Sequence, residues 1–182
     1  MTRWLILVFT LFLSVPAFAQ GNAVSSLDDL LSRLTQSPNE SEVEQITEEV
    51  WALFFDSGSP TVDLLLQRGI TAQKAGMLDL ASDFYGDVVE FAPDFAEGYN
   101  RRAGLEYKRG QFSEALEDLN RALEIQPRHF GALTGLGMVL ERLGAEAAAY
   151  QAYSDALAIN PFEKTAKAGA ERLASAVKGR SL

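Results

Sequence analysis

Small, apolar and polar positions along this chain recur with a period of 34 residues. Pro93, Pro127 and Pro161 are separated by that interval. Six further columns keep the same register, namely Gly69/Ala103/Gly137, Gly76/Gly110/Gly144, Ala81/Ala115/Ala149, Tyr85/Leu119/Tyr153, Val88/Ala122/Ala156 and Phe91/Ile125/Ile159. Columns of matching character at a fixed period indicate a structural repeat that stacks on its neighbours.

Within each period the pattern predicts two antiparallel helices. Tyr85 and Val88 are three positions apart, so they share one face of a helix. Gly69 and Ala81 are small where the two helices must approach closely. Gly76 and its equivalents suit a left-handed turn after the first helix, and each proline stops the second helix. We therefore expect helix pairs in residues 62–95, 96–129 and 130–163, which together fill 61–163.

The flanking segments also show helical periodicity. Residues 20–60 contain two apolar stripes on either side of Ser37-Pro38-Asn39, and a shift of 34 places Trp51 on Tyr85. This segment is predicted to be a degenerate helical pair that caps the array, with looser packing at Thr35 and Thr47. Residues 164–182 are predicted to form a C-terminal capping helix and tail, on the stripe Ala166, Ala170, Leu173 and Val177.

The 34-residue pattern resembles the tetratricopeptide-repeat family. The resemblance implies an all-α fold, a right-handed superhelical stack of antiparallel helix pairs whose first helices line a concave surface. It also implies binding of a protein or peptide on that surface. Arg68, Arg102 and Glu106 depart from the pattern, because the family usually has large apolar residues there. Those columns are expected to pack less well or to face a groove.

The groove residues implied by the resemblance lie on the inner face of each first helix. They are Asp63, Leu66, Ile70, Gln73, Glu97, Asn100, Arg101, Gly104, Tyr107, Lys108, Gly131, Thr134, Met138 and Glu141. Asn100 and Tyr107 are expected to contact the ligand, through an amide that pairs with peptide backbone and a ring with a polar tip. Gly104, Gly131 and Gly135 either admit a ligand backbone or allow close helix packing, and the sequence leaves both open.

The carboxylate clamp of chaperone-binding family members is not expected here. The positions of its cations hold Leu66, Gly131 and Gly135, and an expected asparagine position holds Ile70.

Residues 1–19 have the pattern of a secretory signal peptide. Arg3 is followed by the apolar stretch Trp4–Val15, Pro16, and small residues at Ala17 and Ala19. Twelve apolar residues span only about 18 Å, less than the roughly 30 Å of a bilayer core. We expect cleavage after Ala19 and a periplasmic protein with no membrane anchor; a retained anchor is the alternative.

Composition restricts the chemistry. Cysteine is absent, which excludes disulfides and thiolate metal sites, and the formal charge of −9 disfavours nucleic acid. The single histidine, His129, is interpreted as a surface or packing residue. No catalytic motif is present, so no catalytic residue, cofactor or metal ligand is expected.

Charge is uneven between the two ends. Residues 24–60 carry eight acids and one base, whereas 164–182 carry five bases and one acid. These ends are either ordinary solvated caps or a means of partner choice or head-to-tail self-association.

The sequence therefore predicts a non-enzymatic scaffold or adaptor of the cell envelope whose protein partner is unidentified. Alternatives are an accessory factor of envelope transport or cell-wall synthesis, a hydrolase that uses groove carboxylates, and a structural oligomer.

Overall fold

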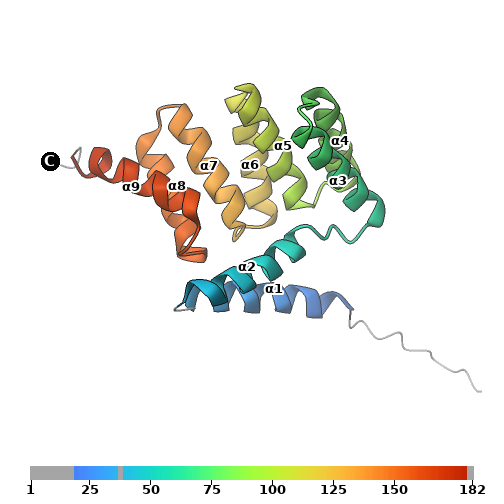
Figure 1. Cartoon of the computed structure of the whole chain (residues 1–182), viewed down its shortest axis with the longest axis horizontal. Helices are drawn as coiled ribbons and strands as arrows, with labels where there is room; N and C mark the ends of the chain where they lie inside the picture. Colours follow the sequence, from blue (N-terminus) through green and yellow to red (C-terminus); the bar gives the residue numbers. More distant parts are fainter. Residues whose placement is uncertain (1–18, 37–38, 180–182) are drawn as a thin grey trace, which may run out of the picture.

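The computed structural model describes residues 19–36 and 39–179, and the regular structure in these ranges is helical (Figure 1). The helices are α1 (Ala19–Gln36), α2 (Glu40–Phe54), α3 (Pro60–Lys74), α4 (Leu78–Phe91), α5 (Ala96–Arg109), α6 (Phe112–Ile125), α7 (Phe130–Arg142), α8 (Glu146–Ile159) and α9 (Lys164–Gly179). The all-α prediction is confirmed. Residues 37–38 of the predicted break at 37–39, and residues 1–18 of the predicted signal peptide 1–19, lie outside the described residues.

Three antiparallel pairs, α3/α4, α5/α6 and α7/α8, stack along the array, and α9 packs against α8 (Figure 1). Gly76, Gly110 and Gly144 follow the first helix of each pair and have φ angles of 77°, 77° and 76°. This left-handed conformation costs glycine little because it has no Cβ, and it is the turn that the sequence predicts.

Glycine also allows the two helices of a pair to approach. A Cβ on Gly69 would come within 2.5 Å of the Tyr85 ring, and one on Gly137 within 2.5 Å of the Tyr153 ring. Both rings are buried, so any larger residue at either glycine would push the helices apart. The small-residue columns of the sequence therefore mark the positions of closest helix contact.

The C-terminal helix α9 covers the end of the array. Ala166 and Leu173 are buried against α8, and Gly169 lies against the other edge of the Tyr153 ring. Tyr153 is thus enclosed by Gly137 of α7 and Gly169 of α9, which leave room for its ring between the two helices. The side chain of Val177, which the sequence assigned to the same stripe, lies outside the described side chains.

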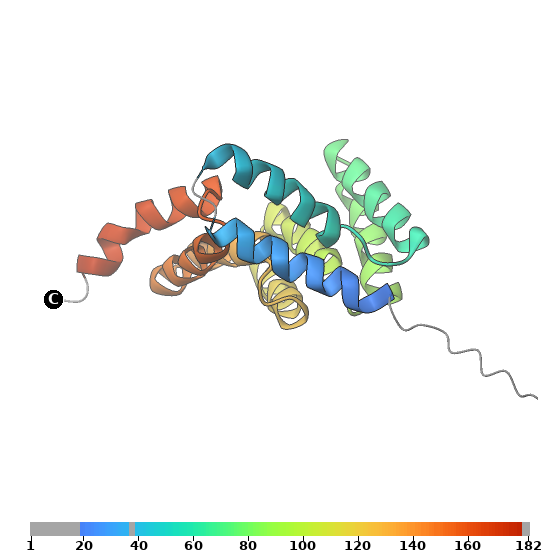
Figure 2. The ribbon, with the colours of Figure 1, turned by 90° about the horizontal axis from the view of Figure 1, so that it is seen from below.

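The N-terminal helices do form a pair, but they do not stack on α3/α4 as the sequence led us to expect. Figures 1 and 2 show α1 and α2 lying across one end of the later pairs, and α1 packs against α8. The threonines in the small-residue positions contact the end of α8. Thr35 Oγ1 donates to the Leu31 carbonyl in its own helix at 2.9 Å and also lies 3.3 Å from the Ile159 carbonyl, and Asn160 Nδ2 donates to Thr47 Oγ1 at 3.4 Å. Two β-branched polar residues thus replace the small residues of close stacking, and their hydroxyls lie against the C-terminal end of α8.

The core of this N-terminal pair is shared with the third repeat. Leu31, Leu34, Val50 and Phe54 are buried in one cluster with Phe130, the first residue of α7. Trp51 meets the Phe130 ring edge-on, at a centroid distance of 5.2 Å. The pair is consequently an integral part of the fold.

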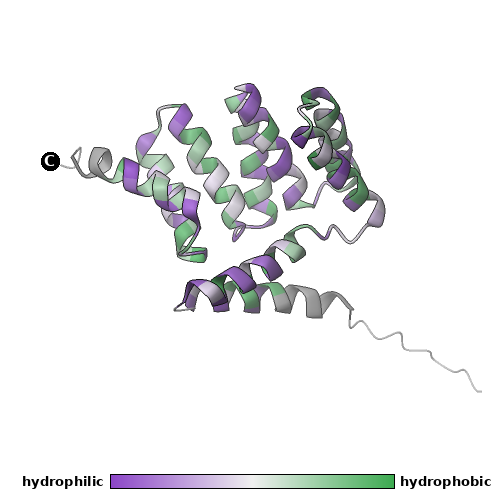
Figure 3. Cartoon of the chain, in the orientation of Figure 1, coloured by the Kyte–Doolittle hydropathy of each residue, from purple (hydrophilic) through white to green (hydrophobic). Residues whose placement is uncertain are grey.

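Hydrophobic and hydrophilic residues both occur along the helices, as the amphipathic pattern requires (Figure 3). Among the described residues, none of the helices combines the length and the apolar character needed to cross a membrane.

Arg102 and Glu106, which depart from the family pattern, lie between α5 and α6 rather than in a groove. Arg102 makes two hydrogen bonds to Asp118, of 2.6 and 2.7 Å. Glu106 lies 3.9 Å from the same guanidinium, and its Oε2 is buried without a hydrogen-bond partner. Burial, together with the charge of Asp118, raises the pKa of Glu106 to about 7. A buried charge pair replaces apolar packing here.

Candidate protein-binding groove

The first helices of the repeats line one side of the array, because α3 contacts α5, α5 contacts α7, and α7 contacts α9. Helix α9 therefore takes the place of the first helix of a fourth pair. Two clefts open along this row of helices, one at each end of α7.

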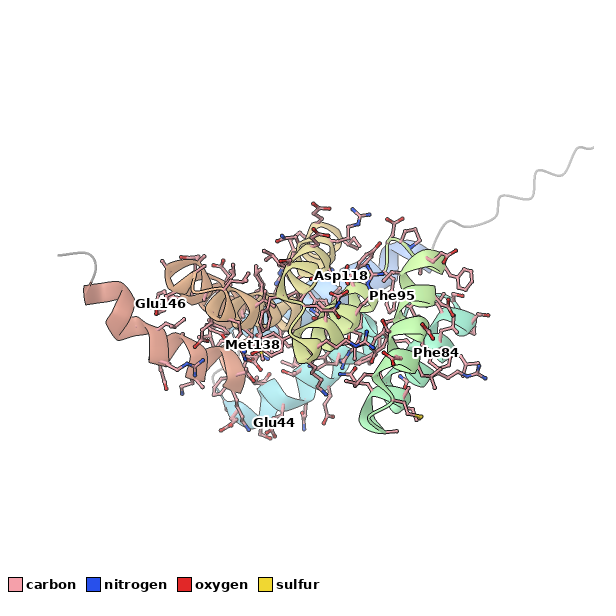
Figure 4. The ribbon with its side chains drawn as sticks, turned by 90° about the horizontal axis from the view of Figure 1, so that it is seen from above. Glu44, Phe84, Phe95, Asp118, Met138 and Glu146 are labelled. Atoms are coloured by element: carbon pink, nitrogen blue, oxygen red, sulfur yellow. The ribbon has the colours of Figure 1, made fainter. Side chains whose placement is uncertain are left out.

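The first, which we call the basic cleft, lies between α5, α7 and α9 and has a volume of about 620 Å³. Its lining residues are Tyr107, Met138, Glu141, Arg142, Tyr153, Lys164, Thr165, Ala168 and Arg172. Met138, labelled in Figure 4, and Tyr107 supply apolar surface. Helix α9 supplies two of the three cations, Lys164 and Arg172.

Arg172 neutralises the one carboxylate in the basic cleft. Its Nε and Nη2 donate to Glu141 at 2.8 and 2.7 Å, and the Tyr153 hydroxyl donates to the same carboxylate at 3.0 Å. The bonds from Arg172 hold the pKa of Glu141 below its usual value, and burial raises the pKa of Tyr153. Glu141 is ionised and paired, so it is not available as a general acid near neutral pH.

The remaining cations give the basic cleft a positive rim. The Arg142 guanidinium lies over the rings of Tyr107 and Phe112, at 6.0 and 4.9 Å from their centroids. Lys164 is exposed and makes no ion pair with any other described residue. The cleft therefore combines an aromatic and thioether floor with uncompensated positive charge.

The second, which we call the acidic cleft, lies between α2, the start of α7 and the loop before α9, with a volume of about 650 Å³. It is lined by Glu40, Val43, Glu44, Thr47, Glu48, Trp51, Phe130, Gly131, Thr134, Asn160, Phe162, Glu163 and Lys164. Helix α2, with Glu44 labelled in Figure 4, thus occupies part of the face that the sequence assigned to a ligand.

Two of the three groove glycines serve close packing. A Cβ on Gly131 would come within 2.6 Å of the Trp51 ring, and one on Gly135 within 3.0 Å of the Leu119 side chain. Gly104 is exposed and has open space beside it. The sequence left open whether these glycines admit a ligand backbone or allow close helix packing. Packing accounts for Gly131 and Gly135, and only Gly104 leaves space for a ligand backbone.

Glu97 and His129 form a buried pair rather than a ligand contact. Glu97 Oε2 is 3.0 Å from His129 Nε2, and both side chains are fully buried. His129 Nδ1 accepts from the Ala132 amide at 3.1 Å and caps α7, which leaves Nε2 to donate to Glu97. Burial opposes the charge of Glu97, but the hydrogen bond from His129 and the charge of Arg101 outweigh it and lower the pKa.

The neighbours of Glu97 are held by the same cluster. Asn100 Nδ2 donates to Glu97 at 2.8 Å, and Arg101 pairs with Glu97. The Arg101 guanidinium also lies 4.8 Å from the centroid of Phe55 and 5.8 Å from that of Trp51. These contacts join the end of α2 to the first two turns of α5, so they contribute to the fold.

The predicted groove residues of the first repeat are separate from both clefts. Leu66 is fully buried, and Ile70 packs on the same core. Gln73 Oε1 accepts from the Tyr85 hydroxyl at 2.7 Å, and Asp63 accepts from Ser57. In the third repeat, Thr134 is buried and donates to the Phe130 carbonyl at 2.9 Å.

Of the predicted set, Tyr107, Met138 and Glu141 come together in the basic cleft, and Gly104 and Lys108 are exposed on α5. The sequence reasoning missed the contribution of α9, namely Lys164, Thr165, Ala168 and Arg172. The excess of bases in residues 164–182 was the available signal.

The comparisons agree with this geometry. A family model described as a tetratricopeptide repeat matches residues 100–164. A TPR repeat-containing protein of Rhizobium etli is 34% identical over 164 residues, which cover 88% of this chain and 80% of that protein. The Sgt2 TPR domain from Aspergillus fumigatus has a TM-score of 0.64 at 22% identity, over 68% of this chain and 83% of that chain. The first TPR of Spaghetti, bound to an HSP90 peptide, has a TM-score of 0.62 at 21% identity, over 64% of this chain and 93% of that chain.

The stacked helix pairs and the clefts along their first helices define a helical-repeat protein, and the similarity to the Rhizobium protein over 88% of this chain identifies its family. The chain belongs to the tetratricopeptide-repeat family. Members of this family are typically non-enzymatic scaffolds for protein–protein interaction. At their low identity the two solved structures show the fold alone.

Proposed function

We propose that this protein is an exported, non-enzymatic adaptor that binds an acidic segment of another protein, with at least one apolar side chain, in the basic cleft. The observation that carries the proposal is that Tyr107 and Met138 line the same cleft as Arg142, Lys164 and Arg172. An amphipathic ring and a thioether offer apolar area for a side chain of the ligand, while the cations attract carboxylates.

The charge of the cleft contrasts with that of the whole chain, which is −9. Glu141 is neutralised by Arg172, so Arg142 and Lys164 remain to attract acidic groups. Such charges act mainly on the association rate and on the choice of partner, and the apolar floor supplies most of the affinity. The first TPR of Spaghetti is described as bound to the HSP90 peptide SRMEEVD, which is also acidic; that description concerns the other protein.

The test compares a labelled acidic peptide containing one central leucine with the same peptide in which lysines replace the acids. Tyr107→Ala is expected to weaken binding of the acidic peptide about thirtyfold, the cost of truncating an interface tyrosine. Lys164→Ala should weaken it about two- to fivefold. Lys167→Ala is the matched control, because Lys167 is exposed on the same helix but does not line the cleft.

Equal binding of the acidic and basic peptides would contradict the proposal. So would unchanged binding by Tyr107→Ala at an unchanged urea midpoint, because the cleft would then not be the site.

The location of the adaptor is proposed from residues 1–19 alone: Arg3, the apolar stretch and the small residues before Gln20. We expect a periplasmic protein whose mature chain begins at Gln20. Mass spectrometry of the protein released by osmotic shock tests this, and an intact Met1 on a cytosolic product would refute it.

A photo-crosslinking amino acid at Lys108, which is exposed beside the groove, would capture the partner in the cell. We propose a protein of the cell envelope, and its identity would separate a general scaffold from an accessory factor of envelope transport or cell-wall synthesis.

A further inference from the structure

Exposed apolar side chains gather on the first helix pair. Among the described residues, five large apolar side chains are exposed, and four belong to the α3–α4 unit: Leu64 (53%), Met77 (50%), Leu80 (41%) and Phe91 (64%). Leu64, Met77 and Leu80 line a depression of about 390 Å³, together with Gln67, Arg68, Thr71, Ala72 and Phe84. We call this surface the α3–α4 end face; Phe84 is labelled in Figure 4 at that end of the array.

The repeat register identifies this surface as one that is built for stacking. A shift of 34 places Leu64 on Gly98, and Thr71 on Leu105, and both Gly98 and Leu105 are buried. A Cβ on Gly98 would come within 2.7 Å of Val88 in the preceding helix α4. The same columns are buried again in the third repeat. The α3 positions that correspond to buried positions in the later repeats are therefore exposed in the first repeat.

Residues 19–36 and 39–179, which the structure describes, do not cover the end face. A fourth pair stacked in front of α3 would have done so, but α1 packs against α8 and α2 packs against the start of α7. The apolar depression is therefore open at the end of the array, while the helix pair that would be its natural cover is committed elsewhere in the core.

The charges around the end face make it complementary to itself. Arg68 lines the α3 side of the end face. On α4, Asp87 is exposed one turn from Phe84, and it also lines a separate depression with Asp83 and with Arg102 of α5. A two-fold axis parallel to the helices lays α3 of one copy over α4 of the other. Because α3 and α4 are antiparallel, Arg68 and Phe84 lie at about the same height, so Arg68 then faces the acidic side of the other α4.

We propose that the α3–α4 end face is the interface of a symmetric dimer of this chain. Two-fold interfaces use the same patch on both subunits and require it to be self-complementary. Here the apolar groups of the two copies meet around Leu64, Leu80 and Phe84, and Arg68 of each copy pairs with Asp87 of the other. The basic cleft lies at the opposite end of the array, so dimerisation leaves the proposed peptide site free.

The first experiment measures the mass of the purified protein by sedimentation velocity over a series of concentrations. We expect a reversible monomer–dimer equilibrium. Leu64→Asp should weaken it at least thirtyfold, as truncation of a central interface residue does. Leu143→Asp is the matched control, since Leu143 is 47% exposed and lies outside the end face, in the turn after α7. It should dimerise as the wild type does.

The second experiment tests the two-fold geometry. Arg68→Glu should weaken the dimer, because it places acids opposite Asp87, and Arg68→Glu combined with Asp87→Arg should restore it. Rescue requires that the two positions face each other across the interface, and circular dichroism verifies that each variant is folded.

A protein that stays monomeric at every concentration, or a dimer that Leu64→Asp and Leu143→Asp affect equally, would overturn the proposal. A monomer whose end face crosslinks only to a different protein would also overturn it, in favour of a partner helix. Peptide binding in the basic cleft is measured separately, so failure here leaves the adaptor proposal standing.

Discussion

Glu106 provides the sharpest test of the electrostatics between α5 and α6. Its carboxylate is largely buried, with 18% of the side chain exposed, and its Oε2 has no hydrogen-bond partner. Burial and the nearby acids Asp118, Glu114 and Glu117 raise its pKa from 4.5 to about 7. The protonated form is therefore favoured by the fold, and the ionised form is disfavoured.

The sign of the pH dependence follows from this shift. Below about pH 4.5 the residue is protonated in both the folded and unfolded states. As the pH rises toward 7, the unfolded chain loses the proton first, so the stability that this group contributes is lost over that window. The shift in pKa corresponds to a free energy of about 3 kcal/mol if it is converted in full. Because 18% of the Glu106 side chain remains exposed, solvent screening reduces the expected value to about 1–2 kcal/mol.

Glu106→Gln removes the charge and retains the shape. We expect the variant to be more stable than the wild type by about 1–2 kcal/mol near pH 8, and equally stable near pH 4, in urea unfolding followed by circular dichroism. Glu90→Gln is the control, since Glu90 is an exposed carboxylate on α4, and its effect should stay within about 0.5 kcal/mol throughout. A stability difference for Glu106→Gln that does not change with pH would refute the reasoning.

Two other substitutions test the packing. Ala115 is fully buried where α6 meets α5, so Ala115→Leu should lower the free energy of unfolding by about 1–3 kcal/mol. Glu117→Leu on the exposed side should change it by less than about 0.5 kcal/mol. If both variants shift the thermal midpoint equally, the predicted repeat register is wrong. Glu97→Ala leaves His129 and Arg101 without their partner. Because removal of one member of a buried pair costs about 3–5 kcal/mol, we expect the free energy of unfolding to fall by that amount. A decrease below about 1 kcal/mol in urea unfolding would show that the pair is solvated.

The repeat unit could be predicted from the sequence because its columns record direct packing constraints. Gly137 must be small because Tyr153 lies on it, and Gly144 must be glycine because its φ is positive. Both constraints act within one period, so they recur at 34-residue intervals and are visible without a structure.

The position of α1 and α2 could not be predicted in this way. Trp51 packs on Gly131 and Phe130, some eighty positions later, and a contact that occurs once leaves no periodicity. Trp51 falls in the aromatic column of Tyr85, which suggested that α1 and α2 stack on the first repeat. The Trp51 ring packs instead on the start of α7.

The candidate site was predicted only in part, for the same reason. Tyr107, Met138 and Glu141 follow from the inner face of the first helices. Glu97 was assigned to the groove, but it is buried against His129, and the sequence does not show a contact between residues 32 positions apart. The contribution of Arg172 was missed because its partner Glu141 is 31 residues away.

The docking of α1 and α2 on the third repeat also affects the order in which the chain can fold. Repeat arrays usually depend on contacts between adjacent units and can grow from any point. Here α1 and α2 are made well before their partners: Phe130 lies about eighty positions after Trp51, and Ile159 lies 124 positions after Thr35. Their leucine faces remain unburied until then, which prolongs exposure to aggregation. Once α1 reaches α8, the N-terminal pair and the third repeat share one core, so neither can unfold without exposing apolar side chains of the other.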